Sequence, residues 1–402
     1  MAIDFSTNIE SLVDTLRKKN GGIAAMDYFY DFSKRLFSGY IDEMKTKDVK
    51  IIGTLCNFVP DELILAAGAL PIRLCSGFRS TVSRAEQIMP ANFCPMIKSS
   101  YGMFLEDGPT FKISDVVVIP TTCDGKKKMA ELIADIKPTW LIEVPHTTET
   151  SAARELWLKS IITLKKELQK LTGIKITQAS LRKSIELCNS KRAAIRRLYE
   201  LRKKKDIPIW GRDVMLVTNI SFYDDCRHYI EHVHALCDEL EQRQESVSGI
   251  AQRVLLTGSP VLLPALKIAN VIEDSNLVIV ADDLCTGSKI FHDPVMPRHW
   301  NMDDMLIALA DKYLMNTCPC FTPNTARSIR LQQMAKDYDV KGLVYYILQA
   351  CHTYNIECWN IQKIFKSMSI PTLKIETDYG DQDVAQLKVR MEAFSEMIHG
   401  QI

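Results

Sequence analysis

The stretch that decides the fold is SDVVVIPTTCDGKKKMAELIADI, residues 114–136. Its first half, VVVIP, is a short apolar run of β-branched residues and predicts a buried strand. A polar turn around Gly125 follows, and KKKMAELIADI then has apolar residues at helical spacing. Alternating strand–turn–helix units are typical of a parallel sheet covered by helices.

Similar units recur in two regions. Residues 49–145 and 249–402 both alternate short apolar runs with helical patterns, whereas residues 1–48 and 146–248 read as mostly helical. The expected strands lie within VKIIGTLC (49–56), LPIRLC (70–75), DVVVIP (115–120), PTWLIEVP (138–145), RVLLTGSP (253–260), NLVIVADDLC (276–285), GLVYYILQAC (342–351) and IPTLKIETDYG (370–380). The expected helices of the second region include VLLPALKIANVIED (261–274), and the last strand is expected to close the chain. We therefore predict an α/β fold in which two parallel-sheet lobes are joined by a helical segment. Within that segment only DVMLVTN (213–219) resembles a strand.

Composition excludes several function classes. A chain of 402 residues predicts two or three domains. The net charge of +1 gives no electrostatic basis for binding nucleic acid or an anionic membrane. The N-terminus lacks the layout of a signal peptide, and no apolar run has the length of about 18 residues that a spanning helix needs. We expect a cytoplasmic protein.

Cysteine is the residue that points to function. The chain has 12 cysteines, and disulfides are rare in a reducing cytosol. Several follow strand-like runs or sit on tight turns, and open parallel sheets bind ligands at the carboxyl ends of their strands. These are Cys56, Cys75, Cys94, Cys123, Cys285, Cys318, Cys320 and Cys351. Thiols gathered at such places from distant parts of one chain predict a metal-cluster site between the lobes, against the alternative of simple burial.

The contexts of these cysteines differ. Cys94 precedes Pro95, a good first helical residue, and Cys123 precedes a helix that opens with three lysines, 126–128. Cations at a helix N-terminus are unfavourable by about 0.3–1 kcal/mol each, so these lysines either face an anionic group or form a solvated turn. Cys318 and Cys320 are too close in sequence for both to bind one iron easily, and we favour Cys320. Cys56 lacks the Gly or Lys context and is expected near the site but not as a ligand.

The remaining cysteines are expected to be packing thiols. They lie in helical segments at Cys188, Cys226, Cys237 and Cys358. Neither the paired C-x2–4-C spacing of structural zinc sites nor the ferredoxin C-x2-C-x2-C run occurs. Scattered ligands fit a cluster seated between two lobes.

Four motifs resemble the family of 2-hydroxyacyl-CoA dehydratase and benzoyl-CoA reductase subunits. They are FCPMIKSSYG (93–102), TTCDGKKKM (121–129), QACHTYNIE (349–357) and IPTLKIETDYG (370–380), and the resemblance runs from about Gly53 to the C-terminus. It implies two flavodoxin-like, Rossmann-like lobes with a helical part. It also implies that the dehydratase-type 4Fe-4S cluster would be held by Cys94, Cys123 and Cys351.

Additional cysteines resemble those of the double-cubane branch of that family. LCSG at Cys75, LCTGSK at Cys285 and NTCPCFTPN at 316–324 carry this resemblance. It implies an 8Fe-9S double-cubane cluster in which each cubane takes three protein thiolates. The six would be Cys75, Cys94, Cys123, Cys285, one of Cys318 and Cys320, and Cys351. It further implies a homodimeric iron–sulfur reductase that acts on a small substrate, with a separate ATP-hydrolysing iron–sulfur activator as electron donor.

The residues agree with a separate ATP-hydrolysing activator, because this chain has no G-x-x-x-x-G-K-[ST] phosphate loop of its own. The lysine turn at 126–128 is a candidate docking feature for the activator. His352 and Tyr354 are candidate proton donors, and each could instead pack beside the cluster. Lys98, Lys126, Gly125 and Gly287 are expected around the cluster, and Glu376 is expected there or in a solvated role. The alternatives are a dehydratase subunit with a single 4Fe-4S cluster and a non-catalytic electron-transfer protein.

Overall fold

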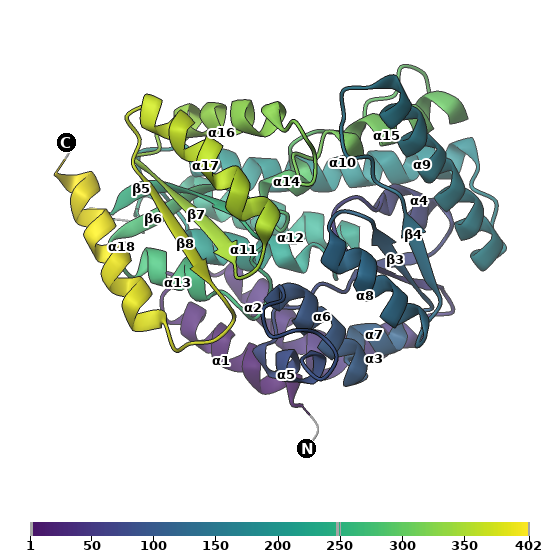
Figure 1. The fold of residues 1–402 in the computed structure, drawn as a ribbon, viewed down its shortest axis with the longest axis horizontal. Coiled ribbons are helices and arrows are strands. Elements are labelled where there is room, and N and C mark those ends of the chain that lie inside the picture. The colour runs from purple at the N-terminus through teal and green to yellow at the C-terminus, as the bar shows by residue number, and fades with distance from the viewer. Residues whose placement is uncertain (1–2, 247–248, 250, 401–402) are drawn as a thin grey trace.

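The computed structural model describes residues 3–246, 249 and 251–400. It has two sheets of four parallel strands each, and helices cover both faces of each sheet (Figure 1). The first sheet consists of β1 (Ile51–Thr54), β2 (Leu70–Arg73), β3 (Val116–Pro120) and β4 (Thr139–Ile142), and the second of β5 (Gln252–Gly258), β6 (Leu277–Asp283), β7 (Gly342–Leu348) and β8 (Thr372–Thr377). The strand orders are β2-β1-β3-β4 and β6-β5-β7-β8, which is one topology used twice. It is the flavodoxin-like order, so the predicted fold class is confirmed.

Alternate residues of each strand enter different hydrophobic cores, as the two-residue period of a strand requires. One core contains Val117 and Ile119 of the first sheet together with Val254 and Leu256 of the second, so it is continuous across both lobes. The opposite face of the first sheet packs into a second core, and the opposite face of the second sheet into a third. The lobes are therefore joined by shared packing as well as by the chain.

The helices fall into three groups along the chain. Those of the first lobe are α4 (Asp61–Ala66), α5 (Val82–Ala85), α6 (Pro95–Leu105), α7 (Pro109–Ile113) and α8 (Asp124–Ala134), with the 3-10 turn η2 (Arg79–Thr81). Those of the middle segment are α9 (Ser151–Thr172), α10 (Gln178–Leu201), α11 (Gly211–Ile220) and α12 (Cys226–Gln242). Those of the C-terminal part are α13 (Lys267–Glu273), α14 (Ser288–Phe291), α15 (Met302–Leu314), α16 (Thr325–Asp337), α17 (His352–Ser367) and α18 (Val384–His399).

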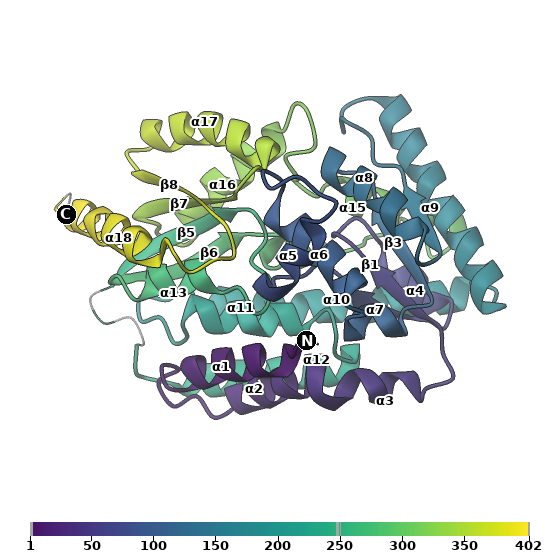
Figure 2. The same cartoon turned by 60° about the horizontal axis from the view of Figure 1, so that its bottom comes forward.

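The N-terminal helices form a layer along one side of the molecule, beneath both lobes (Figure 2). They are α1 (Phe5–Arg17), α2 (Met26–Arg35), the π-helical turn η1 (Leu36–Tyr40) and α3 (Ile41–Lys45). Helix α2 packs on α11 and α3 packs on α7. A buried hydrogen bond of 2.8 Å from the Tyr30 hydroxyl to Asp213 fixes α2 against α11.

Helix α10 joins the two lobes. Its 24 residues span about 36 Å at a rise of about 1.5 Å per residue. On the first lobe, Arg192 donates to the fully buried carboxylate of Glu62 in α4 at 2.5 Å. Near its C-terminal end, the Tyr199 hydroxyl donates to Asp282 of β6. This helix therefore holds both sheets in a fixed relation to one another.

Three expectations about secondary structure are wrong. DVMLVTN (213–219) lies within helix α11, whose ten residues are all buried, so its apolar run marks an enclosed helix and not a strand. Helix α13 begins only at Lys267, and 261–266 is a loop with a turn at 263–264. The chain closes with α18 and not with strand β8.

A segment between strands β6 and β7 packs against the first lobe. Met305 and Leu309 of α15, together with Phe321, pack into the core that covers the first sheet. Helix α15 lies against α9, and the buried Trp157 side chain donates to the carbonyl of Ala310 at 2.9 Å. Residues near 318–320 thereby approach the loops that follow the first sheet.

Candidate metal-cluster site between the two sheets

The carboxyl ends of both sheets open onto one cavity of about 270 Å³, which we name the cysteine cavity. The first three strands of each sheet along the chain contribute in the same way. Cys56, Cys75 and Cys123 follow β1, β2 and β3, and Ser259, Cys285 and Cys351 follow β5, β6 and β7. Both lobes therefore present strand-end side chains to the same space, as ligand sites of open parallel sheets do.

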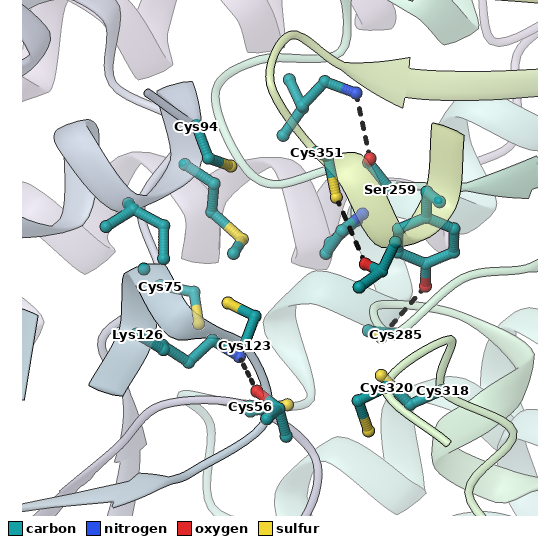
Figure 3. Close-up of a pocket in the computed structure, with 18 of the residues that line it drawn as sticks. Cys56, Cys75, Cys94, Cys123, Lys126, Ser259, Cys285, Cys318, Cys320 and Cys351 are labelled. Atoms are coloured by element: carbon teal, nitrogen blue, oxygen red, sulfur yellow. Dashed lines mark hydrogen bonds between the residues drawn. The ribbon is translucent and has the colours of Figure 1, made fainter. Parts of the chain in front are cut away.

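Eight cysteines line this cavity, and the labelled thiols come from both sides of it (Figure 3). They are Cys56, Cys75, Cys94, Cys123, Cys285, Cys318, Cys320 and Cys351. They surround a space and do not converge on one point. Among the residues that the structure describes, no three His, Cys, Asp or Glu side chains are placed to hold a single metal ion. A hydrogen bond of 2.5 Å from the Asn57 amide to the Cys285 carbonyl ties the two walls together.

Three of these cysteines occupy the N-cap positions of helices. Cys94 precedes α6, Cys123 precedes α8 and Cys351 precedes α17. Free N–H groups and the positive end of the helix dipole favour negative charge at such a position. Burial is the larger effect, however, and it raises the pKa of the Cys94 thiol to about 12 against the opposing effect of nearby backbone N–H groups. Without a bound cation these thiols stay protonated at neutral pH.

The lysine turn divides into two parts. Lys126 is buried, with 6% of its surface exposed, and its ammonium donates to the Thr122 hydroxyl at 3.0 Å. Lys127 and Lys128 instead pair with Asp124 and Glu131 at 2.8 and 2.6 Å on the surface. The first lysine therefore belongs to the cavity wall, whereas the other two form the solvated turn.

Lys126 lacks a carboxylate partner among the described residues. Burial alone would lower the pKa of Lys126, but the thiols of Cys56, Cys123 and Cys75 raise it above its ordinary value. A buried ammonium is costly unless negative charge lies beside it. The wall formed by the first lobe is thus suited to an anionic occupant of the cavity.

The second lobe places a buried charged network behind its cysteines. The Lys289 ammonium lies 3.3 Å from the Tyr354 hydroxyl, which lies 4.0 Å from the Cys285 sulfur. Lys289 and Arg327 both approach Asp283, at 3.5 and 2.8 Å, and all three side chains are fully buried. Burial raises the pKa of Cys285 to about 12, and Lys289 opposes that effect. Cationic side chains therefore lie on both sides of the cavity, and on this side Asp283 and Glu357 pair with them.

The ionisations of Cys318 and Cys320 depend on one another. The thiol of Cys320 donates to Cys318, which lowers the pKa of Cys318 to about 6 and raises the pKa of Cys320. This makes Cys318 the more readily ionised of the two, although the sequence favoured Cys320 as a ligand. Both line the cavity, so either can reach an occupant.

Some of the other predicted site residues line the cysteine cavity and others do not. His352 and Gly125 line the cavity, and a Cβ at Gly125 would lie 2.9 Å from the Phe93 ring. Three do not line it. Lys98 pairs with Glu86 at 2.7 Å, Gly287 packs against the Asp282 carboxylate, and Glu376 accepts a hydrogen bond from Asn355 at 3.1 Å.

Cys56 lines the cavity, in keeping with its expected position near the site, and sequence reasoning missed other residues that line it. Cys56 has a φ of 77°, and a non-glycine residue in this region often marks a functional loop. Its position directly after a strand was the signal. Arg73 and Phe222 also line the cavity. The sequence did carry a signal for Arg73, since an arginine is unusual within the apolar strand LPIRLC. It carried no signal for Phe222.

The four cysteines expected to be packing thiols are all buried in helices. They are Cys188, Cys226, Cys237 and Cys358. None of the helices that the structure describes combines the length and apolarity needed to cross a bilayer.

Comparison with known proteins agrees with the site. The family described as 2-hydroxyglutaryl-CoA dehydratase, D-component, matches residues 56–398. YjiM of Escherichia coli (strain K12), which carries the name of a dehydratase subunit, is 37% identical over 92% of this chain and 97% of its own. The (R)-phenyllactyl-CoA dehydratase beta subunit of Clostridium sporogenes is 25% identical over 88% and 93%. One of the benzoyl-CoA reductase subunits of Thauera aromatica is 26% identical over 75% and 78%.

These matches confirm the predicted family and the prediction of an enzyme component. The family match begins at Cys56 and so includes every cysteine of the cavity and both sheets beyond β1. The chain belongs to the 2-hydroxyglutaryl-CoA dehydratase D-component family, alongside dehydratase and benzoyl-CoA reductase subunits.

Proposed function

We propose that the chain is an iron–sulfur reductase component that binds an 8Fe-9S double-cubane cluster in the cysteine cavity and reduces a small substrate. The observation that carries this proposal is the ring of eight cysteines contributed by both sheets to one enclosed space. Thiolate is the preferred ligand of iron–sulfur clusters. A cluster would supply low-potential electrons at this position.

The donor set fits such a group in number and in charge. The proposed ligands are Cys75, Cys94, Cys123, Cys285, one of Cys318 and Cys320, and Cys351, and all of them line the cavity. An iron–sulfur centre with six thiolates carries negative charge. The buried ammonium of Lys126 offsets that charge on one wall. On the opposite wall, Lys289 and Arg327 lie behind Cys285, where Asp283 and Glu357 pair with them.

The chain's own residues have separate roles in this proposal. Gly125 leaves room for the Phe93 ring against α8, and Lys126 fixes positive charge beside the centre. Tyr354 is placed to move a proton, because its hydroxyl lies between the Lys289 ammonium and the Cys285 sulfur. His352 lines the same cavity and can exchange protons with solvent.

Electrons must come from a partner. The sequence lacks a phosphate-binding loop, so we propose an ATP-hydrolysing iron–sulfur activator as donor, with a homodimer of this chain as acceptor in the cytoplasm of an anaerobic system. Lys127 and Lys128 are exposed beside the cavity wall and remain candidates for docking the activator.

A second candidate is a 2-hydroxyacyl-CoA dehydratase subunit with one 4Fe-4S cluster. The helix N-cap positions of Cys94, Cys123 and Cys351 favour it, because these three thiols share one local geometry. The names of the relatives also include acyl-CoA dehydratases. It leaves Cys75 and Cys285 without a role.

Iron and sulfide quantification after anaerobic purification, followed by EPR, separates the two candidates. About eight irons per chain support the double cubane and about four support the single cluster. We expect Cys75→Ser and Cys285→Ser to lose iron and to change the spectrum. Cys358→Ser is the matched control, because its thiol is buried in α17 away from the cavity. Full iron content and an unchanged spectrum in both test variants would contradict the six-ligand proposal.

A further inference from the structure

A second cavity of about 450 Å³ adjoins the cysteine cavity, and we name it the outer cavity. It lies between strand β2, helices α3 and α10, and the loop that connects α11 to α12. Arg73 and Phe222 line both cavities, so these two side chains form part of the wall between them. The volume is within the range of about 300–1,000 Å³ that is usual for small-molecule sites.

Arg73 is a buried cation without a protein partner. Only 7% of its surface is exposed. Its Nε atom has no hydrogen-bond partner, and neither a hydrogen bond nor an ion pair joins its guanidinium to any residue that the structure describes. The guanidinium lies 4.4 Å from the centre of the Phe222 ring, a cation–π contact. That contact is worth about 0.5–2 kcal/mol and cannot replace the hydrogen bonds a buried guanidinium requires.

The carboxylates nearest this wall are already engaged. Asp224 accepts from the Tyr28 hydroxyl at 2.6 Å. Asp225 accepts from the first backbone N–H groups of α12, and Asp61 lies 3.6 Å from the Lys191 ammonium. Because none of the described carboxylates pairs with Arg73, its guanidinium is available to an anionic ligand that enters either cavity.

We propose that Arg73 binds the carboxylate of a small monocarboxylate substrate that reaches the cysteine cavity through the outer cavity. The planar guanidinium matches a carboxylate with two parallel hydrogen bonds. Arg73 is the last residue of β2 and Cys75 follows two residues later, so the bound carboxylate lies beside the wall that carries that thiol. Phe222 holds the guanidinium in position from the other side. This assignment of a substrate class rests on the proposed function.

Calorimetric titration of acetate into the anaerobically purified protein tests the proposal, in a buffer free of carboxylates and low in chloride. Acetamide, the neutral analogue of the same shape, is titrated in parallel. We expect wild-type protein to bind acetate at one site and to bind acetamide at least about tenfold more weakly, because only the anion pairs with the guanidinium. Arg73→Met should weaken acetate binding by about 10-fold or more, and Arg73→Lys should fall between the two.

Arg227→Met is the matched control. Arg227 also lines the outer cavity, but it is exposed and does not line the cysteine cavity, so we expect acetate binding within about twofold of wild type. Thermal unfolding adds a second readout. Arg73→Met removes an unpaired buried charge, so its melting temperature should not fall below that of wild type; a lower value would show a structural role and overturn the proposal.

Three other results overturn it: no acetate binding to wild type, equal binding of acetate and acetamide, or unchanged acetate binding in Arg73→Met. None of these readouts uses turnover or iron. A protein without iron that still binds acetate through Arg73 contradicts the proposed function alone, whereas a protein with its full iron content that ignores acetate contradicts this inference alone.

Discussion

The substitution Asp213→Asn should stabilise the protein at alkaline pH and much less at acidic pH. Asp213 is buried in α11, its Oδ1 accepts the hydrogen bond from Tyr30, and its Oδ2 has no partner. Burial raises the pKa of Asp213 to about 7, although the Tyr30 hydrogen bond opposes the shift. The folded protein therefore holds this carboxyl protonated at a pH where the unfolded chain ionises it.

The sign follows from proton binding. Between the ordinary pKa of 3.8 and the folded value of about 7, the native state binds more protons than the unfolded state. Stability therefore falls as pH rises through this window, and the full cost is present above it. At about 1.36 kcal/mol per pH unit, the cost grows by about 3 kcal/mol between pH 5 and pH 8.5. Asparagine has no proton to lose and keeps the oxygen that Tyr30 needs.

Urea unfolding of wild type and Asp213→Asn at pH 5 and pH 8.5 measures this cost. The free energy of unfolding of the variant is compared with that of wild type at each pH. Any cost of the amide that does not depend on pH cancels when the difference at pH 5 is subtracted from the difference at pH 8.5. We expect the variant to gain about 3 kcal/mol on wild type between the two conditions. Asp311→Asn, which alters an exposed carboxylate on α15, is the control and should gain less than about 0.5 kcal/mol. A gain at Asp213 no larger than this would show that the carboxylate is ionised in the folded protein.

Three further substitutions test the surroundings of the site. Asp283→Asn leaves the buried Lys289 without a carboxylate and removes one of the two carboxylates that pair with Arg327, the other being Glu357, so it should cost about 3–5 kcal/mol in urea unfolding; a loss below about 1 kcal/mol would contradict the network. Gly102→Ala should destabilise by about 2 kcal/mol or more because the new Cβ would overlap the Thr81 carbonyl, whereas Gly39→Ala has open space and should be neutral or stabilising. Lys126→Met should move the reduction potential of the proposed iron–sulfur centre negative by on the order of tens of millivolts in an EPR redox titration, since a buried cation is lost; an unchanged potential would place Lys126 outside the site.

The sequence predicted all eight strands because most are short apolar runs that end at a polar turn, which identifies a buried parallel strand, whereas β8 (TLKIET) alternates apolar and polar residues. Helix α11 was missed because all of its residues are buried, so it lacks the polar face that distinguishes a helix from a strand. Helix α18 did carry a signal, since Leu387, Met391, Phe394 and Ile398 repeat at helical spacing and are buried.

The cysteine cavity was predictable from one rule, that parallel strands end at the same edge of their sheet. The sequence did not predict that Lys126 lines the cavity while Lys127 and Lys128 pair with carboxylates on the surface. The direction in which each lysine points depends on the exact residue at which helix α8 begins. The isolation of Arg73 was not predictable either. A single sequence shows that a strand contains an arginine, but not whether any carboxylate reaches it.

The repeated topology gives the strongest argument for the larger cluster. Equivalent strands of the two sheets are β1 and β5, β2 and β6, and β3 and β7, because both sheets follow one order. Cys75 and Cys285 then occupy equivalent strand ends, and so do Cys123 and Cys351. Each half of the chain adds one more donor from a loop. Cys94 is the donor of the first half, and the pair at 318–320 is that of the second half, although its loop packs against the core of the first sheet.

A centre held by three thiolates from each lobe therefore uses the same strand positions twice. A single cluster on Cys94, Cys123 and Cys351 would take two donors from one lobe and one from the other, and would leave an equivalent pair of cavity thiols unused. Equivalence also has a measurable consequence: Cys75→Ser and Cys285→Ser should lose iron to a similar extent. If one of them loses iron and the other does not, the two lobes do not contribute alike and the donor set has to be assigned to one side of the cavity.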